Sequence, residues 1–393
     1  MSEEAAAGGR FLFASESVTE GHPDKLCDRV ADAVLDACLV QDPEARVACE
    51  ACTKAGMIMI LGELVTKANV NYEQVIREAV KLVGLDSNDK GLDWRTMNVI
   101  NAMEEQSPDI VQAIAAGKAP EDVGTGEQGI VFGYASDETP EMMPLSHLLA
   151  TRLCLQLDKA RKDGVIQWAC PEGKAQVTVE YTETADRALV PARIHSIVIA
   201  TRHAADVTAE QKEREVMEHV VKPVLPPELC DSSTTYCITE AKQPFGSAHG
   251  DTGLSGRKSA VDTYGGWGSG GGVPISGQDG LRIGRSATYG ARWAARSLVW
   301  SRLCKRCLVQ LSYSPGSAHP SSIHVFSYGT AKSCGKTDAE LTATLKRNFD
   351  FRVGCLQRDL DLKASRFQKL AAYGHFGRSD LELAWEKPKE LHQ

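Results

Sequence analysis

DKLCDRVADAVLDACLV, residues 24–40, spaces its apolar side chains along one side of a helix and predicts an amphipathic helix. Pro23 and Asp24 mark its start, because proline suits the first turn and a carboxylate is favourable near a helix N-terminus. Another side of the helix carries three aspartates that step by four: Asp28, Asp32 and Asp36. The sequence therefore predicts a helix with one apolar side and one acidic side.

A strand hairpin and a second helix come after this helix. The run RVACEACTKAGMIMILGELVTKA, residues 46–68, predicts strands at 47–49 and 57–61 around a tight turn. Residues 71–85 have helical periodicity, which ends at Gly84. These segments together form one strand–strand–helix unit.

The same order of strand, strand and helix recurs twice further along the chain. The predicted segments are strands at 174–183 and 192–204 with a helix at 208–225, then strands at 307–314 and 321–330 with a helix at 338–349. This alternation favours the α+β class, with antiparallel or mixed sheets packed on helices. No close sequence repeat accompanies the pattern, so the pattern alone supports three domains only weakly.

The bulk composition is that of an ordinary globular protein. The chain has 393 residues, of which 42% are apolar and 24% charged, and this length predicts two or three domains. No apolar run approaches the ~20 residues that span a membrane, and the net charge of −8 argues against general nucleic-acid binding. We therefore expect neither a membrane nor a nucleic-acid partner. Residues 1–10 lack a signal-peptide pattern, which predicts a disordered lead-in and a cytoplasmic protein.

Cysteine usage leaves two interpretations open. Twelve cysteines without a secretory signal predict reduced thiols in the cytosol. Two C-x-x-C pairs occur, Cys49/Cys52 and Cys304/Cys307, but a zinc ribbon needs its pairs about 15–20 residues apart. Buried structural cysteines are the favoured interpretation, and a zinc site is the alternative.

SESVTEGHPDK, residues 15–25, gathers charged and polar side chains just before the first helix. Its carboxylates would suit Mg²⁺, while His22 and Lys25 would suit phosphate oxygens. The plain alternative is helix capping, since Ser17 and Glu20 have the spacing of a capping box. We favour the functional interpretation because a cap needs neither the histidine nor the lysine.

GSAHGDTGLSGRKS, residues 246–259, resembles a phosphate-binding loop at first sight. Its two framing glycines are separated by five residues and Arg257 precedes Lys258, so the spacing is not that of a Walker A motif. Adjacent arginine and lysine beside Asp251 nevertheless suit a polyphosphate. The alternative is a glycine-rich turn with surface cations.

YGGWGSGGGVPISGQDGLRIGRS, residues 264–286, carries eight glycines between Gly265 and Gly280. It is either a slack linker or a loop whose backbone approaches phosphates. Residues 240–306 contain ten basic and four acidic side chains, although the whole chain is acidic. This local excess of positive charge predicts binding of a small anion, and solvated helix surface is the favoured interpretation for the arginines after Arg292.

Two further segments give weaker signals. GTGEQGIVFGYASDETPE, residues 124–141, is glycine-rich with Glu127 and Gln128 at its centre. EEQSPDI, residues 104–110, offers Gln106 just before a Gly/Pro/Ala-rich stretch that would suit a mobile lid.

Taken together, these segments resemble the S-adenosylmethionine synthase (methionine adenosyltransferase) family, in a divergent form. The resemblance runs from about Phe11 to Trp385 and rests on several long motifs in the family's order: FLFASESVTEGHPDKLCDRVADAVLDACL, EQSPDI, GTGEQGIVFGYASDETPE, HGDTGLSGRK, VDTYGGWG and AAYGHFGR. It implies three similar α+β domains about a pseudo-threefold axis, here 11–110, 122–239 and 240–386 after the lead-in. It also implies a homodimer or tetramer in which two subunits pack flat sheets together around two active sites.

The resemblance implies a reaction and its participants. The sulfur of L-methionine displaces triphosphate from C5′ of ATP, and the triphosphate is then cleaved to pyrophosphate and phosphate with the help of Mg²⁺ and K⁺. By the same resemblance, Glu16 and Asp24 would serve Mg²⁺ and Glu50 the K⁺ site. Catalytic roles facing the triphosphate would fall to five residues: His22, Lys174, Arg257, Lys258 and Arg282. Substrate-binding roles would fall to Glu63, Gln106, Glu127, Asp251, Lys242, Gln243 and Gln278.

This chain departs from the family pattern close to the phosphates. Where relatives read GRFVIGGP it reads AKQPFGSA, so Lys242 replaces an arginine and Gln243 replaces an aromatic that stacks on adenine. Where relatives read GAHGGGAFSGKD it reads GSGGGVPISGQD, so a lysine becomes Gln278. Other changes are lysine to Arg282, aspartate to Gly284 and, in GAGDQG, aspartate to Glu127. Losing one such cation would cost ~2–4 kcal/mol of transition-state stabilisation.

Three functional hypotheses follow, given in decreasing order of preference. The first is an S-adenosylmethionine synthase, with activity reduced by the changes. The second is a catalytically impaired paralogue that acts as a binding or regulatory subunit of a hetero-oligomer with a conventional paralogue. The third is a related enzyme that uses another nucleotide or acceptor.

Overall fold

The structure is a computed structural model that describes residues 9–106, 117–204, 207–240, 250–268 and 271–392. Three chain segments repeat one order of elements. The first contains β1 (Arg10–Val18), α1 (Pro23–Gln41), β2 (Arg46–Lys54), β3 (Met57–Val65), α2 (Tyr72–Val83) and β6 (Asn98–Glu105), with the short strands β4 (Asp86–Ser87) and β5 (Leu92–Asp93) before β6.

The other two segments follow the same plan. The second contains β7 (Gly129–Ser136), α4 (Leu145–Lys162), β8 (Ala169–Glu183), β9 (Leu189–His203), α5 (Ala209–Val216) and β10 (Thr235–Glu240). The third contains β11 (Gly253–Leu254), α6 (Ser259–Asp262), α7 (Ser286–Trp300), β12 (Arg306–Tyr313), β13 (Ser322–Phe326), α8 (Asp338–Asn348) and α9 (Val353–Asp359). The expectation of an α+β chain with three similar sheet-plus-helix units is confirmed.

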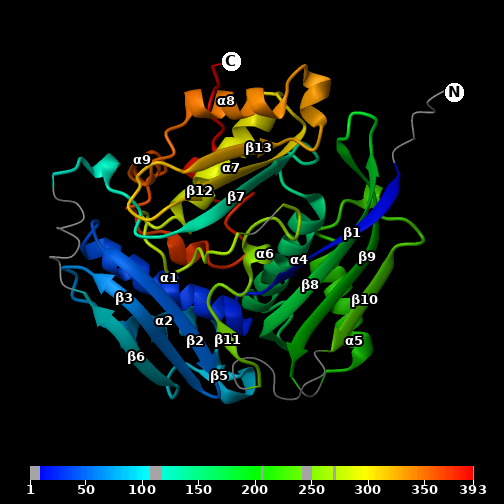
Figure 1. Ribbon diagram of the computed structural model, residues 1–393. Coiled ribbons are helices and arrows are strands. Elements are labelled where there is room, and N and C mark those ends of the chain that lie inside the picture. Colours follow the sequence, from blue (N-terminus) through cyan, green and yellow to red (C-terminus); the bar gives the residue numbers. More distant parts are fainter. Residues whose placement is uncertain (1–8, 107–116, 205–206, 241–249, 269–270, 393) are drawn as a thin grey trace.

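Each segment gives its first strand to the sheet of another segment (Figure 1). The strand orders are β1-β8-β9-β10, β11-β2-β3-β6 and β13-β12-β7. In all three sheets the donated strand pairs antiparallel with the first strand of a hairpin, as β1 does with β8 from Arg10↔Thr182 to Val18↔Lys174. The three segments are therefore joined cyclically by backbone hydrogen bonds as well as by side-chain packing.

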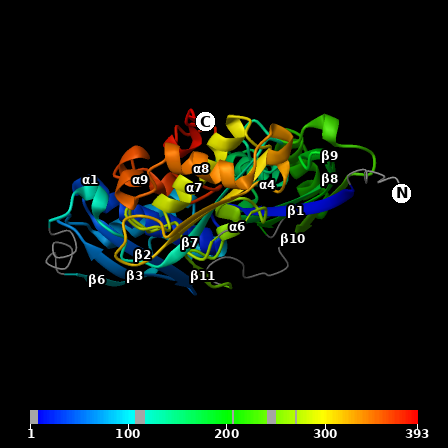
Figure 2. The ribbon, with the colours of Figure 1, turned by 45° about the horizontal axis from the view of Figure 1, so that its top comes forward.

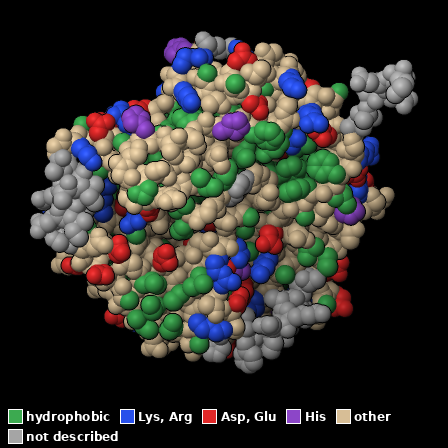
Figure 3. Space-filling model, in the orientation of Figure 1, with side chains coloured by type: hydrophobic (Ala, Val, Ile, Leu, Met, Phe, Trp, Pro, Cys, Tyr) green, Lys and Arg blue, Asp and Glu red, His purple; other side chains and the backbone are tan. Residues whose placement is uncertain are grey.

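The long helices cover one side of the sheets. α1 packs on β2, α4 on β1 and β8, and α7 on β7 and β12. In Figure 2, α1, α7, α8 and α9 lie above the strands β2, β3, β6 and β11. Large apolar side chains stay exposed on strands of all three sheets, among them Leu12, Ile100, Ile130 and Phe326. Hydrophobic side chains gather in patches on the face drawn in Figure 3.

Most elements expected from the sequence are present. The helix predicted at 24–40, the hairpin at 46–68 and the helix ending at Gly84 are confirmed, and Gly84 has the left-handed backbone (φ 90°) that glycine tolerates. The predicted helix at 208–225 forms α5 and continues as a π-helical turn, Met217–Val221.

Two expectations from the N-terminal region are wrong. The lead-in ends earlier than predicted, because Arg10 already pairs with Thr182 in β1. The proposed capping box at Ser17 and Glu20 does not exist, because Ser17 lies inside β1 and the N-cap of α1 is His22.

The acidic side of α1 faces the protein: Asp28 and Asp32 are buried and Asp36 is half-buried. Asp24 accepts a hydrogen bond from the backbone amide of Leu254 (3.0 Å), and Asp28 accepts one from Gly256 (2.8 Å). One and two turns further along, Asp32 accepts from Gly277 (2.8 Å) and Asp36 accepts from the amides of residues 366–368. The third segment therefore docks on α1 through successive carboxylates.

Candidate active site

The first candidate cluster lies where β1 ends and α1 begins. The hydroxyl of Thr19 bonds both Pro171 O and the Gly173 amide at 2.7 Å, which fixes the turn between the two elements against β8. His22 then caps α1, its Nδ1 accepting from the amide of Asp24 (3.2 Å). Lys174 lies on β8 opposite Val18, and its charge acts on His22.

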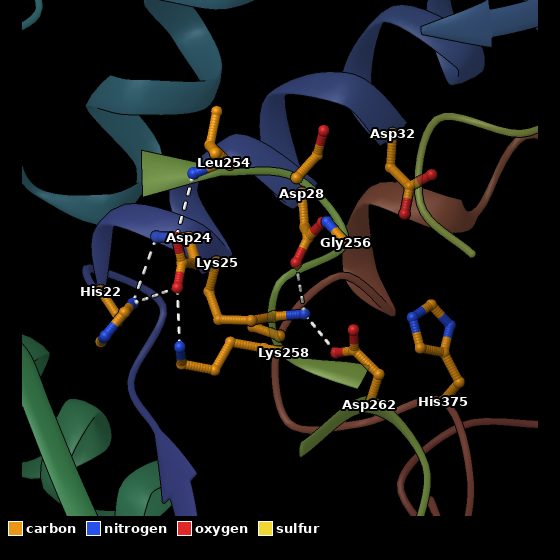
Figure 4. A network of polar contacts seen from close by, with 12 residues as sticks. His22, Asp24, Lys25, Asp28, Asp32, Leu254, Gly256, Lys258, Asp262 and His375 are labelled. Atoms are coloured by element: carbon orange, nitrogen blue, oxygen red, sulfur yellow. Dashed lines mark hydrogen bonds and ion pairs between the residues drawn. The ribbon is translucent and has the colours of Figure 1, made fainter. Parts of the chain in front are cut away.

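The loop that carries Arg257 and Lys258 reaches this place from the other end of the chain. β11 pairs with β2, and the backbone amides of Leu254 and Gly256 donate hydrogen bonds to Asp24 and Asp28. These hydrogen bonds hold the start of the loop against α1. Lys258 Nζ then lies 2.6 Å from Asp24 Oδ2 (Figure 4). Arg257 Nη1 lies 3.7 Å from Asp24 Oδ1. Cations at positions 174, 257 and 258 thus share one neighbourhood with His22.

The electrostatics of this cluster favour binding of an anion. Burial, together with the charges of Lys258 and Lys174, lowers the pKa of His22 to about 3, so the imidazole is neutral at pH 7. Burial raises the pKa of Asp24, but the hydrogen bonds from Lys258 and Leu254 outweigh it and the net pKa is lowered. Asp24 is therefore a carboxylate, and three cations and two carboxylates, Asp24 and Asp251, lie around His22.

A fully buried ion triad lies directly behind the cluster. Lys25 Nζ is 2.9 Å from Asp28 Oδ2 and also contacts Asp262 Oδ1, from α6 (Figure 4). Burial and the charge of Asp262 raise the pKa of Asp28 to about 7, although Lys25 opposes that shift. Because Lys258 precedes α6 directly, the triad fixes the end of the loop that presents Lys258.

The second candidate cluster lines a cavity of about 300 Å³. Its polar lining residues come from the ends of β2, β3 and β6 and from two loops: Arg46, Glu63, Gln106, Thr125, Glu127, Asp279 and Arg282. Arg282 Nη1 bonds Glu127 Oε1 at 2.6 Å, and the Ile283 amide donates to Glu127 Oε2 at 3.3 Å. None of the residues in the first cluster lines this cavity, so one subunit carries the two clusters as separate sites.

The glycine-rich loop is held rigidly along β2. The amide of Cys49 donates to Gly277 O, the amide of Asp279 donates to Val47 O, and Gln278 forms a β-bridge with Ala48. Arg285 bonds Gln278 O and forms a buried ion pair with Asp32 on α1. A slack linker is therefore excluded for residues 277–285.

Gln278 and Gly284 have unusual surroundings. Gln278 is 7% exposed, and its Oε1 has no hydrogen-bond partner among the residues that the structure describes. A Cβ added at Gly284 would lie 2.3 Å from Pro274 O and 3.5 Å from Gln278 Oε1. Any larger residue at 284 therefore requires the 273–278 backbone to move.

Other predicted site residues fall elsewhere or outside the described chain. Glu16 lies exposed on β1 opposite Gln176, and Glu50 lies exposed on β2 opposite Leu61. Asp251 lies exposed beside Arg257's loop and acts by charge on His22. Lys242, Gln243 and the first residues of the stretch after Ile110 that was expected to suit a lid lie outside the described residues.

No group of three or more His, Cys, Asp or Glu side chains is placed to hold a metal ion within the described ranges. All twelve cysteines are free thiols, with Cys49, Cys304 and Cys307 buried and Cys52 half-buried. The burial of Cys49, Cys304 and Cys307 fits the expectation of structural thiols in the two C-x-x-C pairs. Across the described part of the chain, no helix is long and apolar enough to cross a membrane.

Sequence reasoning did not single out several residues that shape the two clusters. Asp28, Asp262 and Arg285 anchor the loops, and Arg46 lines the cavity. The four-residue spacing of the aspartates on α1 was visible, but it did not reveal that backbone amides from more than 200 residues away would bind them. Arg46 lies in none of the motifs that suggested a functional site.

The chain matches three family profiles in consecutive order. They are the N-terminal domain of S-adenosylmethionine synthetase at residues 10–108, the central domain at 122–244 and the C-terminal domain at 245–387. All three describe one class of three-domain α+β protein, and the three repeated segments of the fold fit that architecture. The chain belongs to the S-adenosylmethionine synthetase family.

Proposed function

We propose that this protein forms S-adenosylmethionine from ATP and L-methionine and cleaves the triphosphate to pyrophosphate and phosphate before release. The observation that supports this most is the meeting of His22, Lys174, Arg257 and Lys258 at the N-terminus of α1. Four groups suited to polyphosphate, drawn from three distant stretches of chain, share one place. A structural role alone does not require three cations to gather beside a buried, neutral histidine.

The chemistry explains why cations are needed and a general base is not. The thioether sulfur of methionine is already a nucleophile, whereas the leaving triphosphate gathers negative charge as the C5′–O bond breaks. Fixed cations aimed at that charge stabilise the transition state. Lys174, Arg257 and Lys258 supply such charge, and neutral His22 is able to donate a hydrogen bond at the junction of C5′ and triphosphate.

Mg²⁺ and K⁺ are the cofactors that we propose. Mg²⁺ is usually held by one or two carboxylates together with substrate phosphates rather than by a complete protein cage. Two carboxylates are available for Mg²⁺: Asp24, which is ionised beside Lys258, and Glu16, which is exposed. Glu50 is a candidate for K⁺. When bound, Mg²⁺ would neutralise phosphate charge, while the protein's own cations orient the chain of phosphates.

We propose that two subunits complete each active site. The cluster at α1 suits triphosphate, and the cavity lined by Glu63 and Gln106 suits methionine, yet one subunit holds them apart. The exposed apolar strand residues Leu12, Ile100, Ile130 and Phe326 support the packing of flat sheets from two copies. A homodimer, or a tetramer of two dimers, would bring one cluster from each copy together.

The proposal also covers the domain boundaries and the cellular compartment of the protein. We propose domains at 11–110, 122–239 and 240–386, a division supported by the three repeated segments. Twelve free thiols support a reducing compartment such as the cytoplasm.

The surroundings of Gln278 favour a second candidate function, a catalytically impaired subunit paired with a conventional paralogue. A buried amide stands where relatives carry a lysine, and Gly284 has no room for the aspartate found there in relatives. The two changes remove one positive and one negative charge together, so they leave the net charge of the loop unchanged. This balance favours the active enzyme over the impaired subunit.

The deciding experiment uses the purified homo-oligomer with ATP, L-methionine, Mg²⁺ and K⁺. Methionine-dependent formation of S-adenosylmethionine supports the synthase, and a Lys258→Met variant should lose most of it. Absence of product at millimolar substrates contradicts the synthase. If Gln278→Lys then restores product, the impaired subunit is favoured. Turnover with another triphosphate alone would support a related enzyme instead.

A further inference from the structure

The cavity of about 300 Å³ has the charge pattern of a receptor for a zwitterion. Two arginines and three carboxylates line it: Arg46, Arg282, Glu63, Glu127 and Asp279. An α-amino acid presents an ammonium group and a carboxylate on one carbon, so its receptor needs an acid and a cation a short distance apart. The question is which arginine remains available for the carboxylate.

Arg282 is already engaged by the protein. Its Nη1 lies 2.6 Å from Glu127 Oε1, and its Nε lies 3.9 Å from Asp279 Oδ2. Glu127 also accepts the amide of Ile283, the residue after Arg282. These contacts hold Arg282 against the wall of the cavity and occupy some of the N–H donors of its guanidinium.

Arg46 lies in the same cavity and is not engaged in this way. Among the described residues, no hydrogen bond or ion pair involves its guanidinium, although its charge acts on Asp279. Asp279 is bound by the protein instead, since its oxygens accept backbone amides, Oδ1 from Leu281 and Oδ2 from Val47, each at 2.8 Å, and among the described residues no hydrogen bond joins it to Arg46. Arg46 is thus held near a buried negative charge with its donors unused.

Strand register places Arg46 beside the proposed ammonium site. On β2 and β3 the pairs are Arg46↔Val65 and Ala48↔Glu63, so Arg46 and Glu63 are diagonal neighbours on one face of the sheet. Diagonal neighbours in an antiparallel pair lie roughly 7–8 Å apart, within reach of long side chains. The backbone amide of Gln106 donates a hydrogen bond to Leu64 O (2.9 Å), which holds Gln106 beside the end of β3.

We propose that Arg46 binds the α-carboxylate of the amino-acid substrate while Glu63 faces its ammonium group. The assignment rests on the proposed function, since it names the receptor within the methionine site. A guanidinium binds a carboxylate through two parallel hydrogen bonds, which gives geometric specificity as well as affinity. Arg46 then orients the thioether chain rather than touching the reacting atoms.

Substrate analogues separate this role from a purely structural one. The probes are L-methionine, 3-(methylthio)propylamine, which lacks the carboxylate, and 4-(methylthio)butanoate, which lacks the ammonium. Calorimetric affinities are measured on the whole protein with Mg²⁺ and a non-hydrolysable ATP analogue. Wild-type protein should prefer methionine over the amine about 10- to 100-fold, the range expected for charged hydrogen bonds.

The variants then decide the assignment. Arg46→Met should bind methionine and the amine with nearly equal affinity yet still reject the butanoate, and Arg46→Lys should restore part of the preference. Arg95→Met, at an exposed arginine elsewhere, is the matched control and should behave as wild type. The assignment is overturned if Arg46→Met keeps the wild-type preference, or if Arg282→Met alone removes it. Failure of wild-type protein to bind methionine would instead overturn the proposed function and the assignment with it.

Discussion

Lys258 Nζ lies 2.6 Å from Asp24 Oδ2, although 234 positions of sequence separate the two residues. The contact exists because the amides of Leu254 and Gly256 bind successive aspartates on α1. In the free protein Asp24 therefore holds Lys258 where a phosphate could later take over the ammonium group. The ion pair preorganises the cation before substrate binds.

We expect Lys258→Met to lower kcat for S-adenosylmethionine formation by about 10²–10³-fold, because a fixed cation facing the leaving group is lost. Initial rates at saturating ATP and methionine measure this. Lys332→Met, at an exposed position of the 3₁₀ helix Thr330–Cys334, serves as the control and should leave the rate unchanged. An unaltered kcat in Lys258→Met would show that the cluster does not act on the triphosphate.

The buried triad predicts a stability effect without direct contact to substrate. Lys25→Met leaves Asp28 and Asp262 facing each other without their cation, which should lower the free energy of unfolding by about 3–5 kcal/mol. Urea denaturation followed by fluorescence measures the loss. Adding Asp28→Asn to Lys25→Met removes one of the stranded charges and should recover part of it. If the double variant is no more stable than Lys25→Met, charge burial is not the cause.

His22 predicts a pH effect with a definite sign. Its pKa in the folded protein, about 3, lies below the ordinary value of 6.5, so the unfolded chain binds a proton that the folded chain does not. The stability that His22 contributes is complete above pH 6.5 and declines as the pH falls from there towards 3. A ¹⁵N NMR titration should find the His22 ring neutral at pH 5. Midpoint protonation near pH 6.5 would contradict its burial between Lys174 and Lys258.

Gly284 predicts an asymmetry between two substitutions in one loop. Gly284→Ala should destabilise the protein by about 1–3 kcal/mol, because the new Cβ would lie 2.3 Å from Pro274 O. Gln278→Lys replaces one flexible side chain with another and should be tolerated better. Thermal denaturation of the two variants side by side tests this. Equal melting temperatures would show that the 273–278 backbone yields easily.

The exchanged strands predict that no single domain folds alone. A fragment of residues 9–106 has β1 without its partner β8, and β2 without β11. Exposed strand edges of this kind favour aggregation over folding. Amide NMR spectra of the fragment should show poor dispersion, while co-expression of all three segments as separate chains should restore folded protein. A well-dispersed, monomeric fragment would contradict the role assigned to the exchange.

Local spacing predicted a large share of the fold. Helical periodicity located the helix at 24–40, and Gly84 ended the next one, because these signals depend on neighbours a few residues apart. The long helices α4 and α7 were missed. In α7, most side chains are buried on all sides, so its sequence lacks the polar side that periodicity detects.

For the candidate site, the sequence determined which residue types were present, and motif order linked them to one family. Only the tertiary structure decided which of them meet. In the folded protein, Lys258 forms an ion pair with Asp24, and the acidic side of α1 faces the interior. Arg46 and Glu63 line the same cavity. The physical reason is that spacing along a chain reports only local geometry, whereas contacts between residues 24 and 258 depend on how strands from three segments pair and close over the helices.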